Sequence, residues 1–140
     1  GVVRLPLLGW HAPGVFVDGG AGRHRIAGSA LADVLIGEVW ICSGQSNMVW
    51  AIKDSFEPQA VISNSADDGL RLITVPRVSK DEPQNAIDAK WEACGPSNIE
   101  AFSAVGYYFG KHLRETLKVP VGLINTSFGG TPAEAWTSRE

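Results

Sequence analysis

The order of apolar segments in the second half of the chain constrains the fold most. Apolar residues between positions 102 and 117 recur at steps of three and four, and these are Phe102, Val105, Phe109, Leu113 and Leu117. Such spacing predicts an α-helix with one apolar face. Pro120 ends it, and the apolar run "VGLIN" at 121–125 predicts a buried strand. Strands that alternate with a helix in this way predict a parallel sheet with a right-handed crossover. The expected fold class is therefore α/β.

Two further strands are expected upstream of the helix. The run "VLIGEVWICS" at 34–43 reads as a strand buried on both faces, and "LRLITV" at 70–75 as a second strand that stops at Pro76. Residues 78–90 are polar and predict a surface loop, and "WEAC" at 91–94 predicts a short strand. Residues 1–33 are rich in glycine and predict loops and short β segments. We therefore divide the chain into residues 1–33 and residues 34–140.

The composition limits the classes of function. A chain of 140 residues with 44% hydrophobic residues suits one packed domain. The net charge of −3 shows no basic excess, which argues against a nucleic-acid partner. No apolar run approaches the roughly 20 residues that span a bilayer. Cys42 and Cys94 define neither a disulfide framework nor a zinc site, so we expect both to lie in the core. The compartment cannot be inferred, and a chain without an initiator methionine is expected to start inside a longer protein.

Two glycine-containing loops follow predicted strands. "CSGQSNM" at 42–48 follows the first strand and contains Ser46, and "FGGT" at 128–131 follows the strand at 121–125. The carboxyl ends of parallel strands form the edge where α/β proteins bind ligands. Thr131 is followed by Pro132 and Glu134, the pattern of a capping box, so we expect a helix to begin at Thr131.

Ser46 is the candidate nucleophile of this edge. A serine hydroxyl reacts when a base takes its proton and when N–H donors hold the resulting oxyanion. Gly44 permits a tight turn before Ser46, and an N–H near Gly129 could point to the same place. The motif is not the G-x-S-x-G elbow, because Asn47 and Met48 stand where x-G should follow the serine. A serine that only forms a turn or a helix cap is the alternative interpretation.

The strings "DVLIGEVWICSGQSNM" and "FSAVGYYFGKHL...VPVGLINTSFGGTPAEAWTS" resemble the sialate O-acetylesterase group of SGNH-type carbohydrate esterases, from about residue 24 to the end of the chain. The resemblance implies a three-layer α/β/α sandwich with a flavodoxin-like parallel sheet, present only as its N-terminal part. A preceding β-rich domain is also implied, whose end residues 24–33 could represent. The serine of G-Q-S-N is the nucleophile in that family, which implies this role for Ser46.

The second string supplies an oxyanion glycine in the family. This role is carried over to Gly129, with Gly130 as the close rival. Gln45 and Asn47 are expected to support the substrate or the oxyanion. Trp50 is the tryptophan expected to line a pocket, whereas we expect most of the others to pack in the core or at its edge; these are Trp10, Trp40, Trp91 and Trp136.

The family's catalytic base is not found in this sequence. The resemblance implies an Asp-x-x-His pair and a further oxyanion side chain in later sequence, and the chain stops at Glu140 before either. His11, His24 and His112 do not follow that pattern and are expected to be structural or solvated. A nucleophile without a base is incomplete, so we expect the chain to be the first part of an esterase domain that is inactive alone.

The expected reaction is removal of O-acetyl groups from sialic acid or a related glycan, through an acetyl-enzyme and without a metal or an organic cofactor. Acetyl-xylan esterase and a noncatalytic glycan-binding module are the alternatives. Secretion or a periplasmic location is suggested by the family alone. "FGGT" lacks the G-K-[ST] of a phosphate loop. The carboxylates Glu57, Asp67 and Asp68 are expected to be solvated rather than to form an acid–base pair or a metal site.

Overall fold

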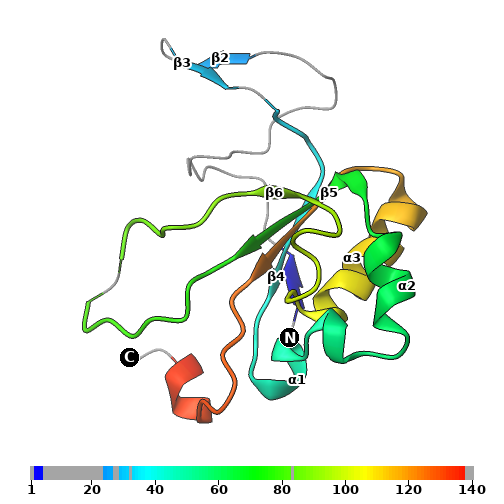
Figure 1. Ribbon diagram of the computed structural model, residues 1–140. Coiled ribbons are helices and arrows are strands. Elements are labelled where there is room, and N and C mark those ends of the chain that lie inside the picture. The colour runs from blue at the N-terminus through cyan, green and yellow to red at the C-terminus, as the bar shows by residue number, and fades with distance from the viewer. Residues whose placement is uncertain (1, 5–23, 27–28, 32, 83, 138–140) are drawn as a thin grey trace.

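The computed structural model describes residues 2–4, 24–26, 29–31, 33–82 and 84–137 (Figure 1). In chain order, its elements are β1 (Val2–Arg4), β2 (His24–Ile26), β3 (Ser29–Leu31), β4 (Glu38–Cys42), α1 (Ser46–Val49), η1 (Ile52–Asp54), α2 (Pro58–Ser63), β5 (Asp67–Thr74), β6 (Glu92–Cys94), α3 (Ala104–Leu117), β7 (Val121–Asn125) and η2 (Ala133–Trp136). The strands expected near 70–75, 91–94 and 121–125 are confirmed.

A mixed five-stranded sheet forms the centre of the fold, in the order β1-β4-β7-β5-β6. The three central strands are parallel, as the sequence predicts, and the outer strands β1 and β6 are antiparallel to their neighbours. The sheet is therefore not parallel throughout. Strand β6 follows β5 through a loop without a crossover helix, and a chain that turns back in this way pairs antiparallel. β2 and β3 form a separate two-stranded sheet.

Strand β4 is shorter and less buried than predicted. It begins at Glu38, and only Cys42 is fully buried among its residues. Gly37 precedes it at a tight crossing, since a Cβ atom there would stand within 1.8 Å of the Pro120 carbonyl oxygen. The Glu38 N–H donates to the same oxygen over 2.9 Å. This crossing fixes where β4 begins beside β7.

Helix α3 confirms the α/β class, but the face that it buries overlaps only in part with the predicted apolar stripe, of which Phe102 lies in the core and Leu113 packs against it. Its buried residues are Ala104, Gly106, Tyr107 and Gly110. Val105 and Leu117 of the predicted apolar stripe are each 47% exposed. A Cβ at Gly110 would lie 2.6 Å from Leu123 Cδ1, so the glycines bring the helix against the sheet. Hydrophobicity alone does not reveal a packing face made of small residues.

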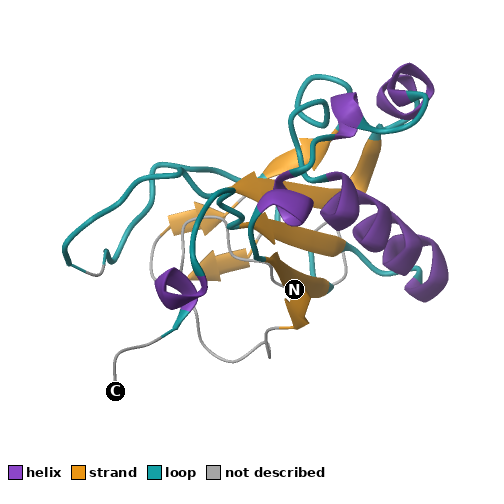
Figure 2. Ribbon diagram, turned by 90° about the horizontal axis from the view of Figure 1, so that it is seen from below, coloured by secondary structure: helices purple, strands orange, loops and turns teal. Residues whose placement is uncertain are grey.

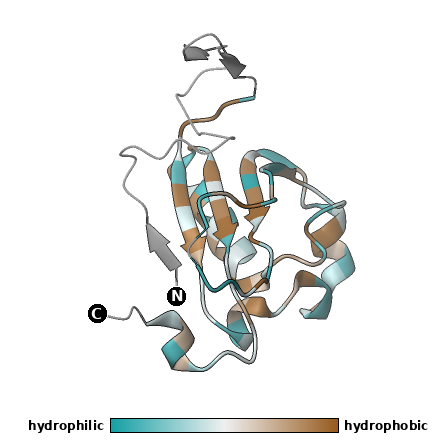
Figure 3. Cartoon of the chain, turned by 90° about the vertical axis from the view of Figure 1, so that its left-hand side faces the viewer, coloured by the Kyte–Doolittle hydropathy of each residue, from teal (hydrophilic) through white to brown (hydrophobic). Residues whose placement is uncertain are grey.

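The core lies between α3 and the sheet (Figure 2). The sheet side chains in this core are Cys42, Leu70, Leu72, Cys94, Val121 and Leu123. Figure 3 shows hydrophobic positions concentrated on the strands, while the loops that leave them are largely hydrophilic. Both cysteines are buried and unpaired, as predicted.

The tryptophans do not share one environment. Trp40 is partly buried and packs edge-on against Phe109, with ring centroids 5.0 Å apart. Trp91 is half-buried, Trp50 and Trp136 are exposed, and Trp10 lies outside the described residues. Core packing is therefore the role of only some of them.

The polar surface elements follow the sequence interpretation with one exception. Residues 78–82 and 84–88 are exposed, as are Glu57, Asp68 and His112. Asp67 is not simply solvated, because its carboxylate accepts the Gly69 N–H over 2.8 Å and lies 3.6 Å from Arg114 Nε. Within the described ranges, no helix has the length and apolar character to cross a membrane.

Candidate active site

Three parallel strands end in register at one edge of the sheet. Cys42 of β4 lies beside Asn125 of β7, and Asn125 lies beside Thr74 of β5. α1 and η2 follow beyond this edge, after β4 and β7 respectively (Figure 1). The two loops that the sequence marks as candidates therefore leave adjacent strands at the same edge.

The first loop turns sharply and presents Ser46 to solvent. Gly44 has φ of 135°, a conformation that glycine adopts without steric cost. α1 then begins at Ser46, and Gln45, Ser46 and Asn47 are all exposed. The short helix is anchored by Met48, which is buried and whose Sδ accepts the Ser103 hydroxyl over 3.3 Å. Met48 therefore holds one side of α1 against the core, while the first residues of the helix stay exposed to solvent.

The second loop packs directly against the first. The Phe128 N–H donates to the Gly44 carbonyl over 2.9 Å, and the Thr126 N–H donates to the Cys42 carbonyl over 3.0 Å. A Cβ at Gly129 would stand 3.8 Å from the Cα of Ser46. Gly130 has φ of 76° and no neighbour within 4 Å of such a Cβ. Of the two glycines, Gly129 is the one that lies against Ser46.

Asn125 and Ser127 hold the second loop in place through hydrogen bonds to each other. The sequence analysis does not predict a role for either residue. Both are buried, and the Asn125 Oδ1 accepts the Ser127 N–H over 3.1 Å and the Ser127 hydroxyl over 2.6 Å. Arg77 Nε donates to the Ser127 carbonyl over 3.1 Å. The available signal was the polar run "NTS" directly after an apolar strand, because buried polar side chains at a strand end require partners.

The predicted helix at Thr131 is wrong. Only the short 3-10 helix η2 forms, and Pro132 precedes it. The Thr131 hydroxyl donates to the Phe128 carbonyl over 2.8 Å and accepts the Trp136 indole N–H over 2.8 Å. These bonds occupy the side chain that a capping box would need for a backbone N–H. The expected helix dipole aimed at the site is therefore absent from the described residues.

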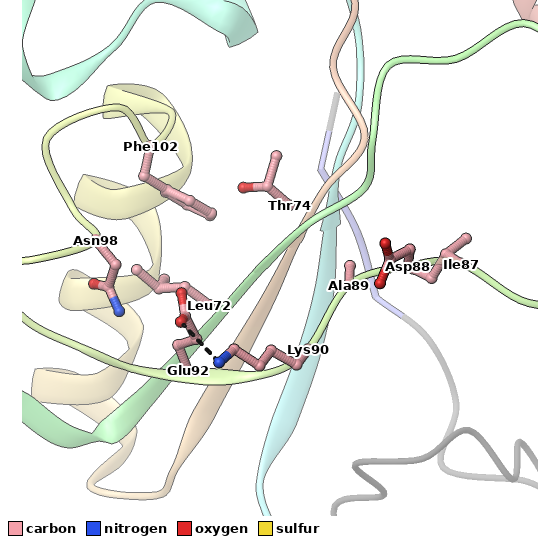
Figure 4. A pocket seen from close by; sticks show the side chains of 9 residues that line it. All are labelled: Leu72, Thr74, Ile87, Asp88, Ala89, Lys90, Glu92, Asn98 and Phe102. Atoms are coloured by element: carbon pink, nitrogen blue, oxygen red, sulfur yellow. Dashed lines mark ion pairs between the residues drawn. The ribbon is translucent and has the colours of Figure 1, made fainter.

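Two cavities lie near the carboxyl edge of the sheet. The first, of about 460 Å³, is lined by β5, β6 and the segments around them; its residues in Figure 4 include Thr74, Asp88, Lys90, Glu92 and Phe102. The second, of about 320 Å³, lies between residues 75–79 and the second loop. Trp50 lines neither cavity; it is 57% exposed and its indole N–H donates to the Asp54 carbonyl over 2.9 Å. Neither of these two cavities therefore matches the prediction that Trp50 lines a pocket.

The buried thiols are unsuited to act as nucleophiles. Burial raises the pKa of Cys42 to about 11 and that of Cys94 to about 12, with the nearby Asp67 carboxylate adding to the second shift. Thiols with such pKa values stay protonated near neutral pH. No group of three potential metal ligands occurs among the residues that the structure describes.

Comparisons with known proteins relate the chain to esterases of acetylated sugars. Proteins named sialate O-acetylesterase are 42% identical to it in Pongo abelii and 40% in Homo sapiens, each over 115 residues, 76% of this chain and 22% of the relative. The mouse protein is 36% identical. A crystal structure of a carbohydrate acetylesterase from Xanthomonas citri matches with a TM-score of 0.71 and 37% identity, over 75% of this chain and 24% of that protein. No family model matches. The chain thus spans about a fifth to a quarter of these relatives.

Proposed function

We propose that this chain, a relative of the sialate O-acetylesterase group of SGNH-type carbohydrate esterases, carries the nucleophile of a serine esterase that removes O-acetyl groups from sugars. The observation that supports it most is the contact between the two loops, in which Gly129 lies against Ser46 at the carboxyl edge of the sheet. The relatives' names support the class of substrate.

Ser46 attacks the acetyl carbonyl carbon in this proposal. Its hydroxyl proton passes to a base, and the carbonyl oxygen becomes an oxyanion that accepts hydrogen bonds from the N–H groups of Ser46 and Gly129. The intermediate then expels the sugar oxygen, which takes the proton from the conjugate acid of the base. Water attacks the acetyl-enzyme in the same way and releases acetate.

The base in this mechanism comes from outside these 140 residues. His112 is exposed on α3, eight residues after Ala104, which places it roughly 12 Å along the helix axis from the end nearer the site. His11 lies outside the described residues, and the side chain of His24 is not described. The resemblance implies an Asp-x-x-His pair in later sequence. We therefore assign the base and its orienting carboxylate to that region.

Gln45, Asn47 and Gly130 are proposed as supporting residues. The two polar side chains flank Ser46 and are exposed at the same turn. Gly130 follows the oxyanion glycine, and its φ of 76° favours a residue without a side chain. Their proposed part is to shape the turn on either side of Ser46 and to support the substrate or the oxyanion there.

The test is acetate release by the complete protein from O-acetylated sialosides and from acetylated xylan. We expect release from the first substrate, its loss in Ser46→Ala, and little or no release by the 140-residue chain alone. Binding of these glycans without hydrolysis would instead identify a noncatalytic module. Activity restricted to xylan would identify the other esterase class.

A further inference from the structure

Helix α1 is too short to fix its own position. It consists of one turn, Ser46–Val49, and a single helical turn is not stable in water without tertiary contacts. Met48 is the one buried residue among the four of this turn. Residues two positions apart on a helix do not share a face, so Met48 can point into the core while Ser46 stays exposed. The placement of Ser46 therefore depends on what holds Met48.

Ser103 holds Met48 through a hydrogen bond. The Ser103 hydroxyl donates to Met48 Sδ over 3.3 Å, and Ser103 is completely buried. A methionine side chain has several rotatable bonds and adapts to cavities of many shapes, so apolar contact alone does not select one conformation. The hydrogen bond directs the sulfur atom toward one point of the core. It thereby gives a fixed partner to the residue two positions after the candidate nucleophile.

Ser103 is itself fixed, because it caps helix α3. Its Oγ accepts the Gly106 N–H over 3.1 Å, which is the hydrogen bond of a helix N-cap. The cap uses a lone pair of the oxygen, and the hydroxyl hydrogen is donated to the thioether. One hydroxyl group thus joins the start of the 14-residue helix α3 to the one-turn helix α1.

The backbone around Ser103 also runs beside the segment that follows α1. Ala51 and Ser103 form an antiparallel bridge. The Ala104 N–H donates to the carbonyl of Trp50, the residue directly after α1, over 2.8 Å. Backbone hydrogen bonds therefore hold the end of α1, and the bond from Ser103 to Met48 holds its middle.

The start of α3 contacts the strand that leads to the nucleophile loop as well. A Cβ atom at Gly106 would stand 3.0 Å from the Sγ of Cys42, and Cys42 is the last residue of β4. Ser46 follows four positions later. The first turn of α3 and its cap thus contact the chain both before Ser46, at Cys42, and after it, at Met48.

We propose that Ser103 is a positioning residue of the esterase, which places the hydroxyl and the N–H of Ser46 against the second loop through its hydrogen bond to Met48. The inference rests on the proposed function and adds to it a residue too deeply buried to contact a sugar. Displacement of a reacting atom by about 1 Å can lower a rate by about 10²-fold. Loss of the bond therefore lowers turnover without weakening the binding of substrate.

The kinetics of the complete protein with an activated acetyl ester test this proposal. Met48→Leu removes the sulfur acceptor at similar volume and leaves the cap of α3 in place, whereas Ser103→Ala removes both hydrogen bonds. We expect each variant to lower kcat by about 10- to 100-fold and to change KM by less than about 2-fold. The double variant should be no slower than Ser103→Ala alone, because the two residues act through one bond.

Ser65→Ala is the matched control. Ser65 is also buried, and its hydroxyl donates to the Ile62 carbonyl over 2.7 Å, but it lies two residues after α2. This variant should lose stability in urea without a change in kcat. An equal fall of kcat in Ser65→Ala, or an unchanged kcat in Met48→Leu and Ser103→Ala, would overturn the proposal.

Met48→Leu separates positioning from capping, and it keeps the test decisive if Ser103→Ala does not fold. A fall of kcat in Ser103→Ala that Met48→Leu does not share would assign the effect to the cap of α3 and would also overturn the proposal. Activity that survives Ser46→Ala would overturn the esterase assignment together with this inference. Activity that depends on Ser46 but is indifferent to Met48 and Ser103 would overturn this inference alone.

Discussion

Gly129 lies against Ser46, so that a Cβ added to the glycine would stand 3.8 Å from the serine Cα. The two residues are 83 positions apart, and the parallel pairing of β4 with β7 brings them together. The bond from Phe128 N–H to the Gly44 carbonyl sets the spacing of their loops. This contact links a candidate nucleophile to a candidate oxyanion donor.

The spacing predicts how substitutions at Gly129 behave. A distance of 3.8 Å is ordinary contact, so Gly129→Ala should be tolerated. Gly129→Val adds methyl groups toward Ser46 and Val49 and should displace the Gly129 N–H. Loss of one oxyanion donor lowers turnover by about 10²–10³. Turnover of an activated acetyl ester by the complete protein measures this, and full activity of Gly129→Val would show that the glycine is not the donor.

The close packing of α3 against the sheet predicts that Gly110→Ala lowers the free energy of unfolding, the opposite of the usual effect in a helix. Glycine to alanine in a helix normally stabilises by about 1 kcal/mol. At Gly110 the new Cβ would lie 2.6 Å from Leu123, so Gly110→Ala should instead destabilise by about 1–3 kcal/mol. Urea unfolding measures the difference. Gly95→Ala, in the bend after β6, is the control for the added methyl group alone, because nothing lies within 4 Å of a Cβ there. Stabilisation by Gly110→Ala would contradict the packing.

Two buried thiols and one buried phenol predict that the folded chain loses stability at alkaline pH. Burial raises the pKa of Cys42 to about 11, and those of Cys94 and Tyr107 to about 12. The unfolded chain loses these protons at lower pH than the folded chain, from 9.0 for the thiols and 10.0 for the phenol. The free energy of unfolding should therefore fall as the pH rises from about 9 to about 12.

Unfolding in urea at several pH values measures this decline. Cys94→Ala should reduce its slope, because one of the three groups is removed. A free energy of unfolding that stays constant between pH 9 and pH 11 would contradict the burial of these groups.

The sequence was most informative where apolar runs are long and proline or glycine bounds them. Strand β7 and helix α3 lie where the pattern places them, because Pro120 separates a helical period from a continuous apolar run. The meeting of the Ser46 and Gly129 loops followed from the rule that parallel strands end at a common edge. These features depend on local pattern and topology alone.

Features that depend on side-chain partners could not be predicted. The hydroxyl of Thr131 bonds to Trp136 and Phe128, which a capping-box pattern cannot reveal. The buried face of α3 is set by Gly106 and Gly110, because the lack of a side chain there leaves room for Cys42 and Leu123 of the sheet. The bracing by Asn125 and the cavity around Arg77 both arise from tertiary contacts across the sheet edge.

Labelling of the complete protein with a serine-directed phosphonate tests the central claim most directly. Mass spectrometry of the peptides should place the adduct on Ser46, and Ser46→Ala should abolish it. Ser43→Ala, three residues earlier in the same loop, should leave labelling intact. An adduct on Ser43, or labelling that persists in Ser46→Ala, would contradict the assignment of Ser46 as the nucleophile.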